Sequence, residues 1–183
     1  MPDVRYVTAG RPKTGGAVHR APAGTTAPTD AATALGEAFV DQGYVSDSGI
    51  VNNNSPSSES VKAWGGDTVL DLQTEKPDTW ALTLISAKDV AVLKTVYGED
   101  NVTGTLETGI TVTANAKELP SSVWVIDQVL RGGTLKRTVL PDAKITEIGE
   151  ITYSDSAAVG YPLTLSAYPD ASGNTHYEYI INP

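Results

Sequence analysis

The stretch from Ser58 to Gly98 constrains the fold of this chain more than any other part of it. It contains three segments in which apolar and polar residues alternate, as they do in strands with one buried face. Gly65-Gly66 separates the first segment from the second, and Lys76-Pro77-Asp78 separates the second from the third. A helical pattern follows, and strand patterns then return. A single helix in an otherwise β chain, with no catalytic constellation, indicates architecture rather than chemistry.

Residues 66–86 are predicted to form a β-hairpin that turns at Lys76-Pro77-Asp78. On its second strand Trp80, Leu82 and Leu84 share one face, as alternate residues of a strand do. The Gly-Gly pair before it is expected to mark a bend or a flexible loop.

A short helix is predicted over about residues 87–97. Ser86 and Asp89 have the spacing of a capping box, and Gly98 supplies a left-handed stop. The apolar stripe between them is formed by Val90, Leu93 and Tyr97. A helix of this length is marginal in isolation and is expected to pack against a sheet.

The second half of the chain contains strand patterns throughout. They occur at Gly109–Ala114, Ser122–Leu130, Leu135–Leu140, Lys144–Tyr153, Tyr161–Tyr168 and His176–Ile181. The loop 131–134 joins two of them as a hairpin, and the isoleucine spacing around Gly149 indicates a β-bulge. The predicted fold is therefore mainly β, a sandwich or small barrel of two packed antiparallel sheets with one flanking α-helix.

The chain has 183 residues, enough for one domain with a real core. Residues 1–35 are rich in Gly, Ala, Thr and Pro and are predicted to be an extended arm and loop, with a possible short strand at 17–20. Residues 36–183 are predicted to form a single β domain. The first 20 residues carry a net charge of +3 within a chain of net charge −9. Their basic residues are Arg5, Arg11, Lys13 and Arg20.

Several function classes have no support in the sequence. The chain has no cysteine, and His19 and His176 are its two histidines, so no metal, cofactor or catalytic residue is predicted. Its acidity argues against non-specific nucleic-acid binding. No apolar run approaches the roughly 20 residues of a membrane span, and the N-terminus has no apolar signal segment, so a cytosolic origin is expected.

Several motifs occur in an order that resembles the major tail tube proteins of long-tailed, non-contractile bacteriophages. They are GYVSDSG in the first quarter, VKAWGGDTVLDLQTEKPDTWALTLI, a helix ending in VYG, VWVIDQVLRGGTLKRTVLPDAKITEIGEITY, and GYPLTLSAYPDASGNTHYEY. The resemblance covers most of residues 17–180.

The resemblance implies a structural virion protein without enzymatic activity. Such proteins assemble in the host bacterial cytoplasm as hexameric rings that stack into a hollow tail tube. The implied partners are further copies of the chain, the tape-measure protein, the tail terminator, and baseplate or tip proteins. Genomic DNA passes through without specific binding. In this context the Gly-Gly pair is expected near a subunit contact.

Two surfaces are expected from combining the resemblance with charge. An acidic bore suits DNA transit, and the residues predicted to face it include some of Asp67, Asp71, Asp127, Glu147 and Glu150. The basic N-terminal arm is predicted to contact an adjacent ring, so deleting residues 1–20 should stop polymerisation and leave the monomer folded.

The main alternative is a carbohydrate-binding or adhesion module of β-sandwich type, such as a capsid or tail decoration. Such a module would use a cleft lined by exposed tryptophans. Trp64 is the one candidate, because Trp80 and Trp124 lie in strand patterns and are expected in the core.

Overall fold

The computed structural model describes residues 3–182, and the parts of the predicted arm and domain at 1–2 and 183 lie outside the described residues. Its helices are η1 (Val4–Tyr6, 3-10), α1 (Val90–Tyr97) and η2 (Glu99–Asn101, 3-10). Its strands are β1 (Gly10–Pro12), β2 (Val18–Pro22), β3 (Val40–Asp41), β4 (Val45–Asn53), β5 (Ser57–Lys62), β6 (Thr68–Glu75), β7 (Thr79–Leu84), β8 (Val102–Thr103), β9 (Thr111–Val112), β10 (Ser122–Leu130), β11 (Leu135–Ile148), β12 (Tyr161–Ala167) and β13 (Tyr177–Ile181). The predicted mainly β class with one α-helix is confirmed over this range.

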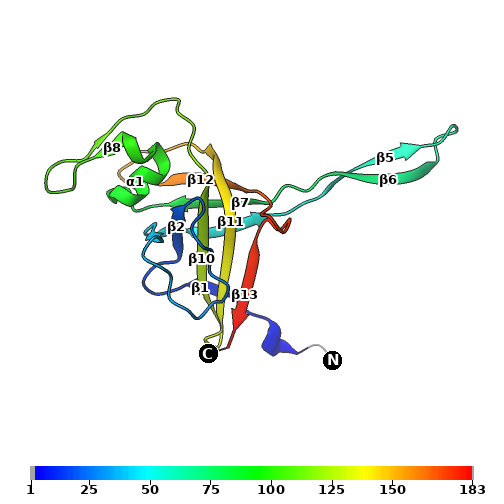
Figure 1. Cartoon of the computed structure of the whole chain (residues 1–183), viewed down its shortest axis with the longest axis horizontal. Helices are drawn as coiled ribbons and strands as arrows, with labels where there is room; N and C mark the ends of the chain where they lie inside the picture. The colour runs from blue at the N-terminus through cyan, green and yellow to red at the C-terminus, as the bar shows by residue number, and fades with distance from the viewer. Residues whose placement is uncertain (1–2, 183) are drawn as a thin grey trace.

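Within residues 3–182, nine strands form one antiparallel sheet that does not close into a barrel. The main path is β3-β2-β10-β11-β12-β7-β4, with β1 also paired to β10 and β13 to β11. In Figure 1, β10, β11 and β13 run steeply, whereas β12 and β7 run almost across them. Two small hairpins, β5-β6 and β8-β9, complete the β structure of these residues.

The long strand β11 joins the two halves of the large sheet. Its first part pairs with β10 and β13, and its last part pairs with β12. The register shifts between Ile145 and Glu147, which is the bulge that the sequence predicts, located a few residues before Gly149. A bulge bends its strand and increases the local twist. The bend allows β11 to pair with strands in both halves of the sheet.

The predicted hairpin around the 131–134 loop is present. Asp127 lies opposite Arg137 in its ladder, and Val125 lies opposite Val139. Six consecutive residues of β10, from Ser122 onward, are buried. The continuous apolar run of this strand therefore reflects coverage on both faces, as expected.

The helix α1 begins at Val90, three residues later than predicted. Asp89 is its N-cap, with a side-chain oxygen that accepts a hydrogen bond of 2.9 Å from the Ala91 backbone N–H. Ser86 is not the cap, because its Oγ accepts a hydrogen bond from the Tyr44 N–H instead. Gly98 ends the helix with φ of 101°, as the sequence predicts.

The core lies between the large sheet and α1. The helix contributes Val92, Leu93 and Val96, and each is at most 6% exposed. The core cluster also contains Trp80, Leu82, Leu84, Trp124, Ile126, Leu140, Tyr161, Leu163 and Leu165. Trp80 and Trp124 are core residues, as expected.

The predicted hairpin over residues 66–86 is wrong. β6 pairs with β5, and β7 pairs with β12 and β4. The true turn of the hairpin lies at Gly65-Gly66, and residues 76–78 are a junction between two paired regions. The alternating pattern identified the strands but carried no information about their partners.

Candidate assembly surface

A long two-stranded ribbon projects from the body of the protein (Figure 1). It continues the β4-β7 pairing: Asn53 lies opposite Thr79, and after a short break Ser57 lies opposite Glu75. The break contains Pro56 on one strand and Pro77 on the other. Proline cannot donate a backbone hydrogen bond, so it interrupts the ladder at this point. We call the outer part, β5, β6 and their turn (residues 57–75), the arm hairpin.

The arm hairpin ends in a turn that requires glycine. Gly65 and Gly66 have φ of 112° and 97°, a region in which residues with a side chain are strained. The Ala63 N–H donates to the Asp67 carbonyl over 2.8 Å and closes the turn. Trp64 lies at this tip and is fully exposed, with a relative accessibility of 106%. The turn therefore displays an indole at the end of the arm hairpin.

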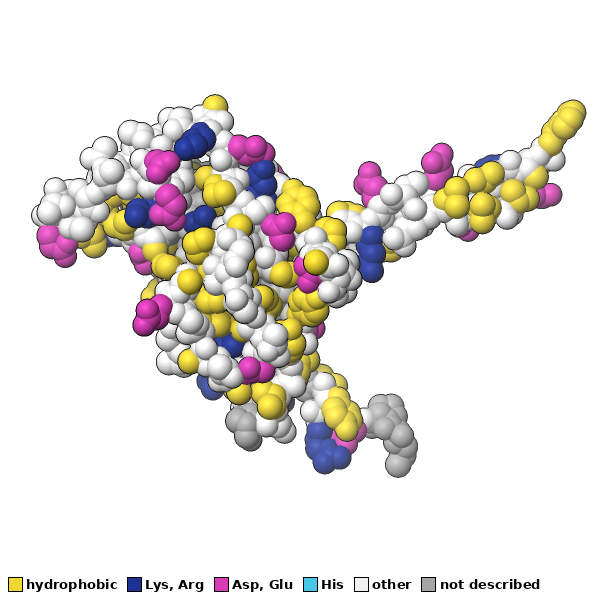
Figure 2. Space-filling view, in the orientation of Figure 1, with side chains coloured by type: hydrophobic (Ala, Val, Ile, Leu, Met, Phe, Trp, Pro, Cys, Tyr) yellow, Lys and Arg dark blue, Asp and Glu magenta, His cyan; other side chains and the backbone are white. Residues whose placement is uncertain are grey.

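One face of the arm hairpin carries three apolar side chains, with Glu59 opposite Leu72 on the same face. Val61 lies opposite Leu70, and Leu72 lies two residues farther along the same strand and so on the same face. These three side chains are 42%, 51% and 50% exposed. Figure 2 shows the hydrophobic side chains gathered along the arm hairpin and at its tip. An isolated two-stranded hairpin is only marginally stable, so this face has the character of an interface without its partner.

A buried carboxylate anchors the ribbon where it leaves the body. Asp78 is 2% exposed and accepts hydrogen bonds from Asn52 Nδ2 (2.7 Å), Thr175 Oγ1 (2.6 Å) and His176 Nδ1 (2.5 Å). Burial alone would raise the pKa of Asp78, but the hydrogen bonds from Thr175, His176 and Asn52 outweigh it, and the pKa lies below its ordinary value. Asp78 thus joins β4, β7 and the segment before β13 at the base of the ribbon.

A comparison with known protein families identifies the family of this chain. A family model described as "Phage tail tube protein" matches residues 3–183. The chain belongs to the phage tail tube protein family. It is therefore a structural protein of the virion, as the sequence motifs predict. A search of curated proteins gives no match.

In this tail tube protein the acidic residues predicted to face the bore lie in three different places. Asp67 and Asp71 are on the arm hairpin, where Asp71 accepts a hydrogen bond from Ser60 Oγ. Glu147 and Glu150 are exposed at the end of β11. Asp127 is 3% exposed and lies inside the protein, so we do not propose that it lines the bore.

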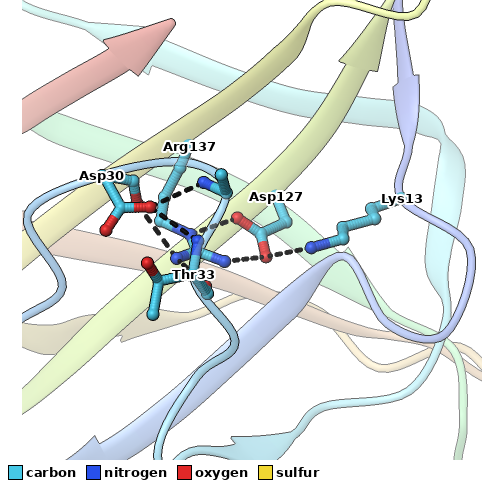
Figure 3. A network of polar contacts seen from close by, with 6 residues as sticks. Lys13, Asp30, Thr33, Asp127 and Arg137 are labelled. Atoms are coloured by element: carbon cyan, nitrogen blue, oxygen red, sulfur yellow. Dashed lines mark hydrogen bonds and ion pairs between the residues drawn. The ribbon is translucent and has the colours of Figure 1, made fainter. Parts of the chain in front are cut away.

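The ion pair of Asp127 explains its burial. Both oxygens accept from Arg137, with Nε to Oδ1 at 2.6 Å and Nη2 to Oδ2 at 2.8 Å, and Arg137 is 1% exposed (Figure 3). Arg137 Nη1 also donates to the carbonyls of Asp30 and Thr33. Lys13 Nζ lies 3.6 Å from Asp127. This network fastens the 30–33 loop to the sheet.

Sequence reasoning missed this network, although a signal was present. A hairpin centred on Gly132 places Asp127 directly opposite Arg137, two opposite charges in otherwise apolar runs. With the predicted loop at 131–134, Leu135 would lie opposite Leu130 and Thr138 opposite Asp127. The observed register is shifted by one residue, with Leu135 opposite Val129, and this shift brings Arg137 opposite Asp127.

The basic residues predicted to form an inter-ring arm are also dispersed. Arg5 is exposed and pairs with Asp3, and Arg11 is exposed on β1. Lys13 faces Asp127. Arg20 lies on β2, where its guanidinium donates to Ser122 Oγ, Thr95 Oγ1 and Glu99 Oε1. Arg20 is therefore engaged within the protomer.

The predicted arm itself contributes to the sheet. β1 and β2 both pair with β10, so the boundary at residue 36 does not separate a free arm from the domain. Deleting residues 1–20, the truncation predicted from the sequence to leave the monomer folded, would remove β1 and most of β2. A truncation confined to residues before Gly10 leaves the sheet intact.

Among residues 3–182 there is no group of three or more His, Asp or Glu side chains that could hold a metal ion. Within the same range, no helix is long and apolar enough to cross a membrane.

Proposed function

We propose that this tail tube protein polymerises as hexameric rings that stack into a hollow tube, through which the phage genome is delivered. The observation that carries the proposal is the arm hairpin, a ribbon with no buried residue in its strands and with exposed apolar side chains, which reaches well outside the body of the protein. An element of this kind gains little within one chain and gains a buried interface in a polymer. Open sheet edges such as β4 would likewise be paired by ring closure.

The bore of the tube is proposed to be acidic. Glu147 and Glu150 are its candidate lining residues, since both are exposed and lie on the body rather than on the arm hairpin. Asp67 and Asp71 would face the bore only where the arm hairpin itself lines it. An acidic wall repels phosphate and so allows DNA to pass without being bound. A ring with a basic bore would contradict this part of the proposal.

The segment before Gly10 is proposed to contact the adjacent ring through Arg5, with Arg11 beside it on β1. Truncation of residues 2–7 removes most of this segment and spares every strand of the sheet. It also keeps Thr8 and Ala9, whose oxygens accept hydrogen bonds from the Arg131 N–H. Tube formation should stop while the circular dichroism spectrum and the midpoint of thermal unfolding stay unchanged. Normal tubes from the truncated protein would show that the segment is dispensable.

The further partners are those of a growing tail: a tape-measure protein inside the tube, a terminator at one end and baseplate or tip proteins at the other. The alternative of a carbohydrate-binding module would need a cleft lined by exposed tryptophans. The groove beside α1 and the shallower hollow beside β4 contain no tryptophan side chain. Trp64 stands at a tip, where no cleft surrounds it.

Negative-stain electron microscopy of the purified protein, before and after concentration, tests the proposed assembly. Rings with six subunits and tubes with a central channel are expected as the concentration rises. A protein that remains monomeric at every concentration and binds glycans would contradict the proposal.

A further inference from the structure

A groove lies beside α1, on the side of the body away from the arm hairpin. Its volume is about 610 Å³, and its walls come from β2, β3, α1 and the segment before β10. Most of its lining is apolar, including Pro22, Val40, Val90, Ala91 and Pro120. A hollow of this size and lining is in the range that receives a bulky side chain or a small ligand.

Charged groups of both signs complete the groove. Arg20 and Lys94 line it together with Glu99, which lies 3.4 Å from Arg20 Nη1 and 3.6 Å from Lys94 Nζ. The Arg20 side chain is 14% exposed and is held by its bond to Ser122. A fixed guanidinium beside an apolar wall is a favourable environment for the face of an aromatic ring, and a carboxylate can accept an indole N–H.

The same chain carries an unpartnered aromatic side chain that matches this environment. Trp64 is fully exposed, whereas Trp80 and Trp124 are 6% and 1% exposed in the core. Its neighbours at the tip are Lys62 and Asp67. They complement the mixed charges at the groove, where Glu37 and Lys94 are part of the lining.

We propose that the Trp64 indole of one subunit occupies the groove beside α1 of a neighbouring subunit. The contact is heterologous, because a knob on one surface meets a hole on a different surface, and contacts of this kind generate rings or open filaments. The inference rests on the proposed tube and specifies which surface receives the tip of the arm hairpin.

The occupant must come from another copy of the chain. At about 3.3 Å per residue, the ribbon carries Trp64 about 35 Å beyond Asn53, the last residue of β4. Figure 1 shows the arm hairpin and α1 on opposite sides of the body. Trp64 therefore does not reach its own groove without unfolding the ribbon from the sheet.

Site-specific photo-crosslinking in assembled tubes tests the contact directly. Trp64 is replaced by the photoreactive aromatic residue benzoylphenylalanine, and crosslinked peptides are identified by mass spectrometry. Intermolecular crosslinks to peptides containing residues 20–23, 37–42, 90–99 or 120–122 are expected. The same probe at Tyr6, an exposed aromatic residue of η1 outside the groove, should give none of these crosslinks. Crosslinks from position 64 only to other surfaces, such as the 104–118 segment or the N-terminal segment, would overturn the inference.

A second experiment fills the groove with a side chain of the subunit that carries it. Ala91→Trp places an indole in the groove, and Ala157→Trp makes the same change on an exposed loop as the matched control. Ala91→Trp and Trp64→Ala should each raise the protein concentration needed for tubes by about tenfold or more, the loss expected for a central aromatic anchor. Ala157→Trp should leave that concentration unchanged, and all three variants should unfold at the wild-type temperature.

The outcomes separate this inference from the proposed function. Tubes that form normally from Ala91→Trp or from Trp64→Ala would overturn the groove contact and leave the tube proposal standing. A wild-type protein that forms neither rings nor tubes would contradict both.

Discussion

β6 and β7 are neighbouring strands with nearly the same alternating pattern, yet their environments are opposite. On β7, Trp80, Leu82 and Leu84 are at most 6% exposed, because α1 and the rest of the sheet cover them. On β6, Leu70 and Leu72 are about half exposed. An alternating pattern indicates that one face of a strand becomes buried. It does not indicate whether the residues that bury this face belong to the same chain, as for β7, or to another copy, as we propose for β6.

The comparison predicts that body and arm hairpin respond differently to substitution. Changes in the body should lower the stability of the monomer, and changes in the arm hairpin should affect assembly alone.

The largest loss of stability is expected from Arg137→Ala. It leaves the buried Asp127 carboxylate without its partner, and breaking a buried pair on one side costs about 3–5 kcal/mol. Urea unfolding followed by circular dichroism measures the change. The double variant Arg137→Met, Asp127→Leu is the control, since it removes both charges and should recover most of the loss. If Arg137→Ala were as stable as wild type, the network would contribute little to the stability of the monomer.

Leu84→Ala should cost about 2–5 kcal/mol, because Leu84 is 0% exposed and the substitution leaves a cavity in the core. Thermal and urea unfolding of the monomer give the value. A loss below 1 kcal/mol would mean that the core between the sheet and α1 is loosely packed.

Asp78→Asn should destabilise the monomer by about 1–3 kcal/mol, because it weakens a hub of three hydrogen bonds at the base of the ribbon. Equilibrium unfolding at neutral pH gives the value. The loss should be accompanied by faster hydrogen exchange in residues 52–53 and 79–80. Unchanged hydrogen exchange in these residues would show that Asp78 does not anchor the ribbon.

The pH dependence of this site has a definite sign. The pKa of Asp78 in the folded protein lies below its ordinary value of 3.8, so the unfolded chain takes up the proton first as the pH falls. The contribution of Asp78 to stability is therefore complete above about pH 3.8 and is lost as the pH falls through the folded pKa. Wild type should lose more stability than Asp78→Asn over this acidic range. Parallel curves would contradict the assignment.

Asp89→Ala removes the N-cap of α1 and should cost about 1 kcal/mol. The matched control is Asp155→Ala on the exposed loop after β11, which should change stability by less than about 0.5 kcal/mol. Equal effects of the two substitutions would show that the cap does not hold the helix.

The smallest effect on the monomer is expected from Leu72→Ala, within about 0.5 kcal/mol of wild type. The same variant should nevertheless form tubes poorly, as judged by light scattering and negative-stain microscopy. Its match in the body is Leu84→Ala, which makes the same chemical change at a buried position. A large loss of monomer stability in Leu72→Ala would place the arm hairpin within the fold of the body.

Much of the fold follows from local patterns. The single helix and its stop at Gly98, the β10-β11 hairpin and the bulge in β11 were predictable, because each depends on residues close together in the sequence. The partners of β6 and β7 were not, since residues 76–78 resemble a hairpin turn as much as a junction. The glycines at 65 and 66 held the better turn signal, with a left-handed conformation that favours glycine.

The assembly surface was less predictable than the fold. The expected importance of the acidic and basic residues rested on charge and on the family resemblance, and neither distinguishes the exposed Glu147 from the buried Asp127. Pairing information resolves the two, because Asp127 lies opposite Arg137. The display of Trp64 at a tip depends on the pairing of β5 with β6, which a strand pattern by itself does not contain.

Hydrogen exchange of the monomer and of assembled tubes, read peptide by peptide, tests whether another subunit covers the arm hairpin. Amides of residues 57–75 should exchange rapidly in the monomer and become strongly protected in tubes, whereas those of β10 should be protected in both. Equal exchange of residues 57–75 in monomer and tube would contradict the claim that the arm hairpin finds its partner in another subunit.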